Sequence, residues 1–314
     1  MAGGRNTPGT IMNQQPPIHI DGFRGEILYD EPMSQHTSLK IGGPADLFVR
    51  PVDIADLKCA VKFFQTHATP YMTIGGGYNM LVRDGGIRGA VIVLDQFRTM
   101  SWSENTLCYV ESGNSNLEVV RFIQRNDMGG ISFISGIPGT IGGALRMNAG
   151  AYGKSILNFV ENIHLLRNGE LVIIPQHAIR YSYRNLELEP GDIIIGASIR
   201  VTPTPVEETE QEITNDLLLR REKHNVGFPS AGSFFKNPSG GAAWKLIDAA
   251  GMRGHQQGDA QFAALHSNFL INRGAACAQD CLTLVAEVKK AVFKTSGVLL
   301  EEEVRIVGED DLRC

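Results

Sequence analysis

One stretch of the sequence decides how the rest of the chain is interpreted: Ser135-Gly-Ile-Pro-Gly-Thr-Ile-Gly-Gly-Ala-Leu-Arg-Met-Asn-Ala-Gly-Ala-Tyr-Gly153. Six of its nineteen residues are glycine, and Arg146 carries its only charge. A run this rich in glycine indicates backbone that comes very close to another group or takes a positive φ. Bare N–H groups with one hydroxyl among them are suited to hold a diphosphate. The residues that would do so are Gly136, Gly139, Thr140, Gly142 and Gly143.

A mobile linker is the alternative interpretation of this stretch. Linkers are usually polar, whereas this one and the residues before it carry regularly placed apolar side chains. These are Ile131, Phe133, Ile134, Ile137, Ile141, Leu145 and Met147. Because they would pack the loop onto a core, the diphosphate cradle is favoured over the linker.

A second glycine loop, Gly75-Gly-Gly-Tyr-Asn79, follows directly after a short apolar run that is typical of a buried strand. It is not the Rossmann fingerprint, because Met80 stands where the third glycine belongs. Neither loop ends in Gly-Lys-Ser/Thr, so the sequence gives no support to a kinase or ATPase. Two such loops about sixty residues apart predict one extended ligand that is gripped from both sides, and a dinucleotide fits.

Length and composition limit the class of protein. A chain of 314 residues exceeds the size of one ordinary core, so two or three domains are expected. A net charge of −5 gives no general attraction to nucleic acid or to an anionic membrane, and no apolar run approaches the length of a membrane span. The polar residues 1–17 predict a disordered tail and no signal peptide.

Five scattered cysteines suit reduced thiols in a cytoplasmic protein. Cys277 and Cys281 could share a helix face, but no further cysteine or suitably spaced histidine accompanies them, so we expect no metal site. Neither glycine loop contains His or Cys, which disfavours a covalent bond to a cofactor.

Hydrophobic periodicity and turn residues predict an α+β protein with a boundary at 203–205. Asn168-Gly169 predicts a tight hairpin turn. The expected strands are 45–50, 71–74, 90–94, 108–111, 158–166, 171–175, 192–202, 268–272 and 298–307. The expected helices are 53–67, one from about 115, 206–223, 242–250 and 280–295, with Asp53 as N-cap of the first and Gly297 after the last.

Three motifs outside the glycine loops could carry chemistry. Arg184 follows two tyrosines and could hold a carboxylate, although a surface arginine lying across a ring is the commoner case. Ser233 lies in a polar and aromatic loop without the Gly-x-Ser-x-Gly elbow of an acyl-enzyme serine. Glu301-Glu-Glu303 taken alone is most often a solvated edge, with Glu302 on the opposite face from its neighbours.

Taken together, these pieces resemble one family, the UDP-N-acetylenolpyruvoylglucosamine reductases, called MurB, of peptidoglycan synthesis. Any one match is weak, but eight in the right order over about 270 residues are highly specific. The matching stretches are His36-Thr-Ser-Leu-Lys-Ile-Gly-Gly-Pro-Ala-Asp46, Gly75-Gly-Gly-Tyr-Asn79, Gly136-Ile-Pro-Gly-Thr-Ile-Gly-Gly143, Met147-Asn-Ala-Gly-Ala-Tyr-Gly153, Tyr183-Arg184, Ala231-Gly-Ser-Phe-Phe-Lys-Asn-Pro238, His266-Ser-Asn-Phe269 and Glu303-Val-Arg305.

The resemblance implies a fold and a domain plan. It implies a two-lobed FAD-binding domain of the vanillyl-alcohol-oxidase (PCMH) type over 18–204, with lobes of roughly 18–85 and 86–204. A smaller α+β substrate-binding domain would occupy 205–314, and its last strand is able to return to the flavin site. The short interval between Arg184 and Ser233 is similar to the family branch that lacks an extra substrate-covering loop.

The resemblance also implies the activity, namely an oxidoreductase that uses non-covalent FAD and NADPH to reduce UDP-N-acetylglucosamine enolpyruvate to UDP-N-acetylmuramate. Arg184 and Glu303 would stabilise negative charge on the substrate, and Ser233 would donate the proton. Cofactor contacts would come from Gly75, Gly76, Gly77, Tyr78, Asn79, Met80, Gly136, Pro138, Gly139, Thr140, Ile141, Gly142 and Gly143. Substrate contacts would come from Tyr152, Arg221, Lys236 and Asn237. No nucleic acid, membrane or obligate protein partner is expected.

The sequence departs from the family pattern at a few positions near these motifs. Tyr78 replaces a small serine in the first glycine loop, and Leu186 replaces a serine that usually follows the Tyr-Arg pair. His224-Asn225 stands in place of Gln-Pro, and Glu302 in place of proline.

Two rival functions stay open from the sequence alone. One is a flavin oxidase or dehydrogenase of the same fold with a different substrate, and the other is a nucleotide-binding protein that has lost catalysis. The intact Arg184, Ser233 and Glu303 argue against the second rival.

Overall fold

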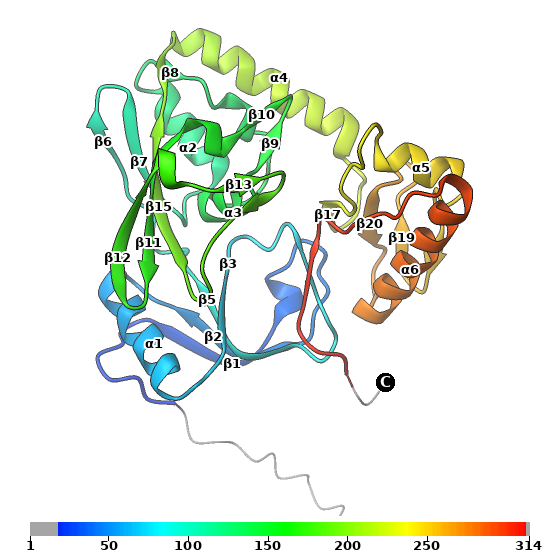
Figure 1. Cartoon of the computed structure of the whole chain (residues 1–314), viewed down its shortest axis with the longest axis horizontal. Helices are drawn as coiled ribbons and strands as arrows, with labels where there is room; N and C mark the ends of the chain where they lie inside the picture. Colours follow the sequence, from blue (N-terminus) through cyan, green and yellow to red (C-terminus); the bar gives the residue numbers. More distant parts are fainter. Residues whose placement is uncertain (1–17, 312–314) are drawn as a thin grey trace, which may run out of the picture.

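Three sheet-centred units make up the chain, two of them stacked and the third beside them (Figure 1). This computed structural model describes residues 18–311, so the tail expected over 1–17 lies outside the described residues. The apolar core of the first unit includes Leu166, Ile193 and Ile195 of the second, and the third unit shares its core with residues of the first.

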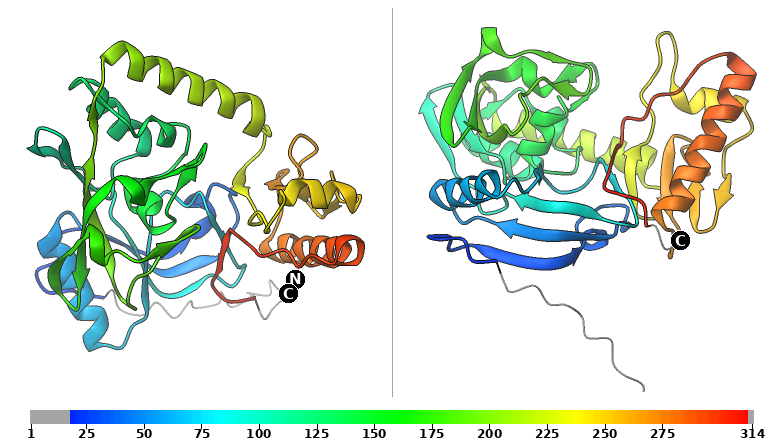
Figure 2. Two further views of the ribbon diagram at one scale, coloured as in Figure 1. Left: turned by 45° about the horizontal axis from the view of Figure 1, so that its top comes forward. Right: turned by 60° about the horizontal axis from the view of Figure 1, so that its bottom comes forward.

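The first unit is a four-stranded sheet in the order β1-β2-β5-β3, covered by one helix (Figure 2). Its elements are β1 (Glu26–Pro32), β2 (Pro44–Arg50), α1 (Ile54–Thr66), β3 (Tyr71–Ile74) and β5 (Ile87–Val93), with the turn η1 (Met33–Gln35) after β1. Asp53 begins α1 as expected, because its side chain accepts a hydrogen bond from the Asp56 N–H at 2.9 Å. Leu57, Val61 and Phe64 then bury the inner face of α1 against the sheet.

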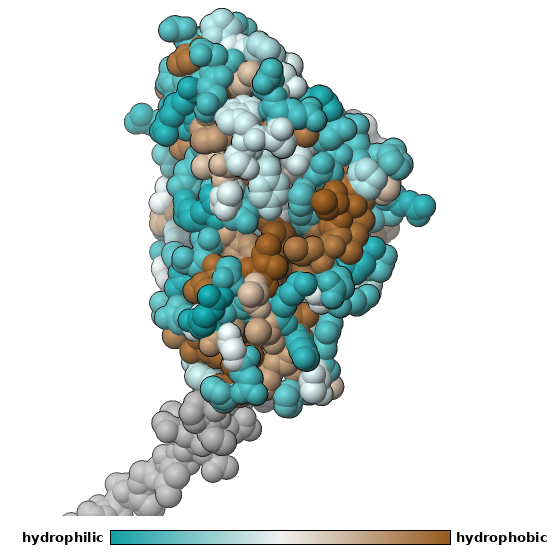
Figure 3. Space-filling view, turned by 90° about the vertical axis from the view of Figure 1, so that its left-hand side faces the viewer, coloured by the Kyte–Doolittle hydropathy of each residue, from teal (hydrophilic) through white to brown (hydrophobic). Residues whose placement is uncertain are grey.

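The second unit is a five-stranded antiparallel sheet in the order β12-β11-β15-β7-β6. Its strands are β6 (Met100–Glu104), β7 (Leu107–Glu111), β11 (Val160–Arg167), β12 (Glu170–Pro175) and β15 (Ile193–Arg200). The predicted hairpin turn is confirmed, because Asn168 and Gly169 both have positive φ, 51° and 80°. The edge strand β12 exposes Leu171 and Ile173, on the side of the molecule where Figure 3 shows an apolar strip between polar residues.

Helices and short turns pack on the inner face of this second sheet. They are α2 (Asn116–Gln124), η2 (Ser132–Ile134), α3 (Ile141–Arg146), η3 (Ile156–Phe159) and η4 (Gln176–Ala178). Three two-stranded ribbons accompany them: β8 (Met128–Gly129) with β16 (Thr202–Pro203), β9 (Gly150–Ala151) with β10 (Lys154–Ser155), and β13 (Tyr181–Ser182) with β14 (Asn185–Leu186). The long helix α4 (Val206–His224) contacts η2, α2 and β8 and leads toward the third unit (Figure 1).

The third unit is a four-stranded sheet in the order β17-β20-β19-β18 with two helices. Its elements are β17 (Ser230–Ser233), α5 (Ala243–Ala249), β18 (Gln256–Gln257), β19 (Ala260–Phe262), β20 (Phe269–Asn272) and α6 (Ala278–Ser296). The end of α6 is as expected, with Gly297 at a φ of 71°.

The chain ends by returning to the first unit. β21 (Arg305–Val307) pairs in parallel with β4 (Met80–Val82), the strand directly after the first glycine loop. Leu39, Ile41 and Leu81 of the first unit also belong to the apolar core of the third. The two units are therefore joined by a ladder and by a shared core. The domain boundary after residue 204 stays a prediction, and α4 packs on η2, α2 and β8 of the second unit.

Two expectations about the elements were wrong. The last strand was expected over 298–307, but only Arg305–Val307 forms a ladder, because the N–H groups of Glu303 and Val304 donate instead to the Phe234 carbonyl. The glycine stretch was expected to be a loop, but it contains α3, which begins after Thr140. Ile141, Ala144 and Leu145 recur at helical spacing and could have indicated this short helix.

Candidate functional site

The two glycine loops lie against each other, as the sequence predicted for a ligand gripped from both sides. A Cβ atom added to Gly75 would lie 2.6 Å from Thr140 Oγ1, and one added to Gly76 would lie 3.6 Å from Gly139 Cα. Gly139 has a φ of 123°, which other residues rarely adopt. Position 75 thus requires glycine because Thr140 lies too close for a side chain, and position 139 requires it because of the positive φ.

The loops also present backbone donors. Among the residues that the structure describes, none accepts a hydrogen bond from the N–H groups of Gly76, Gly77, Tyr78, Gly139 or Thr140. Such a group of unpaired donors fits a nucleotide diphosphate. The residues present therefore fit the dinucleotide cofactor that the sequence predicted.

Two glycines predicted to contribute to this cradle, Gly142 and Gly143, donate their N–H groups to other parts of the chain. The Gly142 N–H donates to the Ser112 carbonyl at 3.0 Å, and the Gly143 N–H faces the Thr140 hydroxyl at 3.4 Å. A Cβ at Gly142 would lie 2.6 Å from that of Ser112, so glycine at this position permits α3 to pack on the loop after β7. The N–H groups of these two glycines already have partners within the chain, and their contact with the cofactor stays a prediction.

Arg184 and Glu303, 119 residues apart, form an ion pair. Arg184 lies at a φ of 57° in the two-residue turn between β13 and β14. Its Nε donates to Glu303 Oε1 at 2.8 Å and its Nη2 to the Gly150 carbonyl at 3.1 Å. The Glu303 side chain is only 14% exposed, so the solvated-edge alternative is wrong for this residue.

Tyr183 completes this group. Its hydroxyl lies 3.4 Å from Glu303 Oε2, and its ring centroid lies 4.8 Å from the Arg184 guanidinium carbon. Burial, and then the Glu303 charge, raise the pKa of the Tyr183 hydroxyl, which therefore remains a neutral donor. The pair of Arg184 and Glu303 is thus held from both sides.

The backbone of Glu303 connects the first glycine loop with the strand that bears Ser233. The Glu303 N–H donates to the Phe234 carbonyl at 2.7 Å, and Asn79 Nδ2 donates to the Glu303 carbonyl at 3.0 Å. Ser233 is the last residue of β17 and precedes Phe234 directly. The side chain of Asn79 thus holds the segment that bears Glu303, and its contact with the cofactor stays a prediction.

Ser233 ends a strand that is firmly anchored. Phe234 is fully buried, and its N–H donates to the Asn268 carbonyl at 2.7 Å. The Ser233 hydroxyl makes no hydrogen bond to any residue in the described part of the chain. The structure therefore brings three predicted catalytic residues to one region and leaves this hydroxyl available.

The predicted substrate contacts have mixed placements. Lys236 forms an ion pair with Glu301 at 3.2 Å, and the side-chain oxygen of Asn237 accepts from the Ala243 N–H at the start of α5. Arg221 is exposed, whereas its neighbour Arg220 is partly buried beside Tyr152. Sequence reasoning did not single out Arg220, because two adjacent arginines cannot be assigned to helix faces without the packing of α4.

Arg146 was noted as the only charge of the glycine stretch, and the structure gives it a role. Its Nη1 donates to the Leu186 carbonyl at 2.6 Å and to Asn185 Oδ1 at 3.0 Å. Asn148 Nδ2 donates to the Ser182 carbonyl at 3.1 Å. The glycine stretch thus holds both strands of the turn that presents Arg184.

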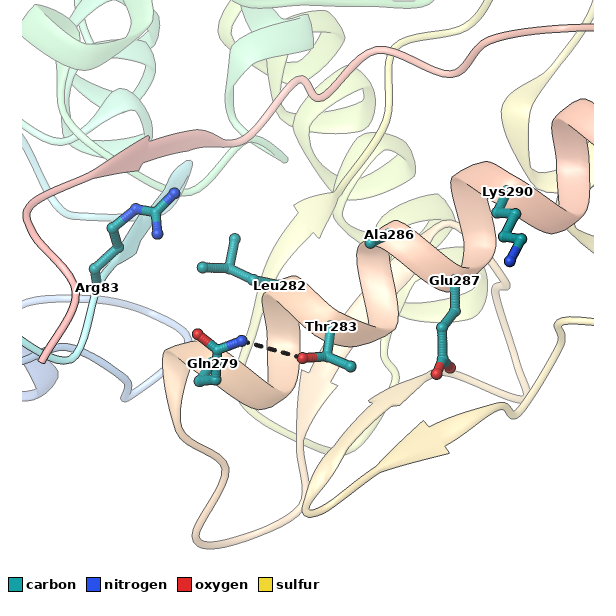
Figure 4. Close-up of a pocket in the computed structure, with 7 residues that line it drawn as sticks. All are labelled: Arg83, Gln279, Leu282, Thr283, Ala286, Glu287 and Lys290. Carbon is teal, nitrogen blue, oxygen red and sulfur yellow. Dashed lines mark hydrogen bonds between the residues drawn. The ribbon is translucent and has the colours of Figure 1, made fainter. Parts of the chain in front are cut away.

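Other features of the surface do not implicate a second site. A shallow hollow beside α6 is lined by Arg83, Gln279, Leu282, Thr283, Ala286, Glu287 and Lys290, and none of these was predicted to bind a ligand (Figure 4). Within residues 18–311, no three His, Cys, Asp or Glu side chains gather as they would around a metal ion. None of the helices in this range is both long and apolar enough to span a bilayer.

Paired glycine loops beside an anchored Arg–Glu pair define a nucleotide-binding flavoprotein of the oxidoreductase class, and a family model described as an FAD binding domain matches residues 45–173. A second model, described as the C-terminal domain of UDP-N-acetylenolpyruvoylglucosamine reductase, matches residues 223–307. The chain belongs to the UDP-N-acetylenolpyruvoylglucosamine reductase family, which confirms the resemblance seen in the sequence.

Individual relatives agree with this assignment. The reductase of Pelobacter propionicus is 54% identical over 288 residues, which cover 92% of this chain and 98% of that protein. The reductase of Geobacter sulfurreducens is 45% identical over 300 residues, covering 95% of this chain and all of that protein. The crystal structure of the reductase (MurB) from Thermus caldophilus is similar at a TM-score of 0.77 and 29% identity, covering 90% of this chain and 98% of that one.

Proposed function

We propose that this chain reduces UDP-N-acetylglucosamine enolpyruvate to UDP-N-acetylmuramate with NADPH, a reaction of peptidoglycan synthesis. The observation that carries the proposal is the ion pair of Arg184 and Glu303, which is tied through Asn79 to the first glycine loop and through Phe234 to Ser233. FAD, when bound, accepts hydride from NADPH and supplies it to the enolpyruvyl double bond. The unpaired N–H groups of the two glycine loops would hold its diphosphate.

Arg184 is suited to bind the carboxylate of the substrate. A guanidinium has five N–H donors, and the Glu303 and Gly150 contacts use two of them. Those that remain can stabilise negative charge as it grows on the carboxylate side of the double bond. Glu303 holds the guanidinium in this orientation.

Ser233 is proposed as the proton donor to the carbon that bears the carboxylate. Its hydroxyl has no partner within the described residues, and the rigid strand β17 fixes its backbone next to Phe234. A serine is a weak acid, so this role depends on close placement at a carbon that already carries developing negative charge.

We propose further that the chain acts in the cytoplasm and needs no obligate protein partner. Its five scattered cysteines suit a reducing compartment. The partner proposed for the site is a small molecule, the UDP-sugar. The family branch without the extra substrate-covering loop stays a prediction.

The test is NADPH oxidation by the purified yellow protein, followed with and without the enolpyruvyl sugar nucleotide. We expect oxidation to depend on that substrate and the product to gain two hydrogen atoms by mass spectrometry. Arg184→Gln should abolish this turnover and retain FAD. NADPH oxidation that proceeds equally without the substrate would instead support the rival oxidase.

A further inference from the structure

Arg220 is a partly buried cation that has no ion-pair partner among the described residues. It lies on the last turns of α4, and burial lowers the pKa of its guanidinium. No residue in the described part of the chain forms an ion pair or a hydrogen bond with it. Arginine is seldom buried without a partner, so an unpaired one requires an explanation.

The nearest acidic candidate does not supply the missing partner. Asp216 precedes Arg220 by one helical turn, the spacing at which Asp and Arg often pair. The charge of Asp216 acts instead on Tyr152, and Glu212 and Lys154 are the charges that act on Asp216 itself. Asp216 and Arg220 form no ion pair among the described residues, although their spacing would permit one.

One tyrosine from each glycine loop lies close enough to Arg220 to act on it electrostatically. Tyr78 comes from the first loop and Tyr152 from the second, and both interact electrostatically with Arg220. The helix itself lies over the glycine stretch, because a Cβ added to Gly136 would lie 3.3 Å from the Asp216 carbonyl oxygen and 3.9 Å from Arg220 Cβ. Neutral tyrosines provide donors and ring faces but no negative charge.

We propose that Arg220 binds a phosphate group of a nucleotide bound between the two glycine loops, as the counter-charge that the loops themselves lack. Arg220 lies beside the glycine loop that presents unpaired N–H groups, and a guanidinium matches phosphate with two parallel hydrogen bonds. The inference rests on the proposed function and deepens it. The shared chemistry is a nucleotide diphosphate, and its source is either FAD or the sugar nucleotide.

The test compares Arg220→Gln and Arg220→Lys with the parent protein in two arms. One arm measures the dissociation constant of FAD with the apoprotein, and the other measures the KM for the sugar nucleotide with saturating FAD. Charge-assisted hydrogen bonds contribute about 1.5–3 kcal/mol. Arg220→Gln should therefore raise either the FAD dissociation constant or the KM for the sugar nucleotide by about 10- to 150-fold. Arg220→Lys should recover part of the loss, because lysine retains the positive charge but cannot form two parallel hydrogen bonds to a phosphate.

The affected arm identifies the ligand. A rise in the FAD dissociation constant assigns the phosphate to the cofactor, and a rise in KM alone assigns it to the substrate. Changes below twofold in both arms would overturn the proposal. Because the FAD arm requires no turnover, it remains informative if the proposed reaction is wrong.

Stability separates a binding role from a structural one. Since Arg220 has no partner within the described residues, Arg220→Gln should leave the melting temperature of the apoprotein unchanged or raise it. A lower melting temperature would overturn the proposal in favour of a structural arginine. Arg125→Ala, which removes an exposed arginine after α2, is the neutral control. A larger effect from Arg221→Ala than from Arg220→Ala would also contradict the assignment.

Discussion

Replacing Asn79 with alanine separates the two roles that this residue could have. In the structure its side-chain amide donates to the Glu303 carbonyl at 3.0 Å, while its own carbonyl accepts from the Arg305 N–H at 3.1 Å. Asn79→Ala removes only the first bond. Losing one such hydrogen bond costs about 1 kcal/mol, or up to about 3 kcal/mol when a buried acceptor is left unpaired.

Glu303 keeps its N–H bond to Phe234 and its ion pair with Arg184, so the segment should stay folded. The free energy of unfolding should fall by about 1–2 kcal/mol. A displacement of the Arg184–Glu303 pair by about 1 Å can lower kcat by about 100-fold. We therefore expect a large loss of kcat with FAD retained at nearly full stoichiometry.

The assay combines steady-state kcat, the ratio of bound flavin to protein, and urea unfolding. Asn126→Ala is a matched control, because it removes a 2.8 Å amide bond to the Phe122 carbonyl at the end of α2. If Asn79→Ala instead releases FAD and leaves kcat of the reloaded enzyme unchanged, Asn79 is a cofactor contact. The proposed link to Glu303 would then be wrong.

Three more predictions concern packing, the substrate and pH. Gly142→Ala should lower the free energy of unfolding by about 1–3 kcal/mol because its Cβ meets Ser112, whereas Gly143→Ala, with its nearest atom at 3.7 Å, should cost less in the same urea titration. Lys236→Ala should raise the KM for the sugar nucleotide more than that for NADPH, and equal rises in steady-state kinetics would count against a substrate contact. Burial lowers the pKa of His164, so the unfolded chain binds its proton first and the stability from this group is lost as the pH falls below about 6.5. His164→Gln should therefore lose less melting temperature than the parent protein between pH 7 and pH 5, and identical losses would refute this linkage.

Local patterns predicted most of the elements because they follow from short-range physics. The Asp53 cap, the Asn168-Gly169 turn and the Gly297 helix end each depend on a few adjacent residues, and the structure confirms them. The close approach of the two glycine loops was also inferable, since both had the same chemical character. These features needed no knowledge of the tertiary fold.

Long-range contacts decided what the sequence could not. Nothing in the sequence near Glu303 indicates that its N–H donates to the Phe234 carbonyl, and the expected strand therefore begins only at Arg305. Likewise, only the three-dimensional structure reveals that Gly142 permits α3 to pack against Ser112. The choice between Arg220 and Arg221 depends on which face α4 turns toward Gly136.

The most direct test of the central claim measures both half-reactions of Ser233→Ala by stopped-flow. Flavin reduction by NADPH requires no proton from Ser233, so its rate should stay close to that of the parent protein. Reoxidation by the enolpyruvyl sugar nucleotide should slow by about 10² to 10⁴, the usual cost of losing a positioned acid, and Ser233→Cys should recover part of it. Equal slowing of both half-reactions would contradict the account, because Ser233 would then only support the loop between β17 and α5.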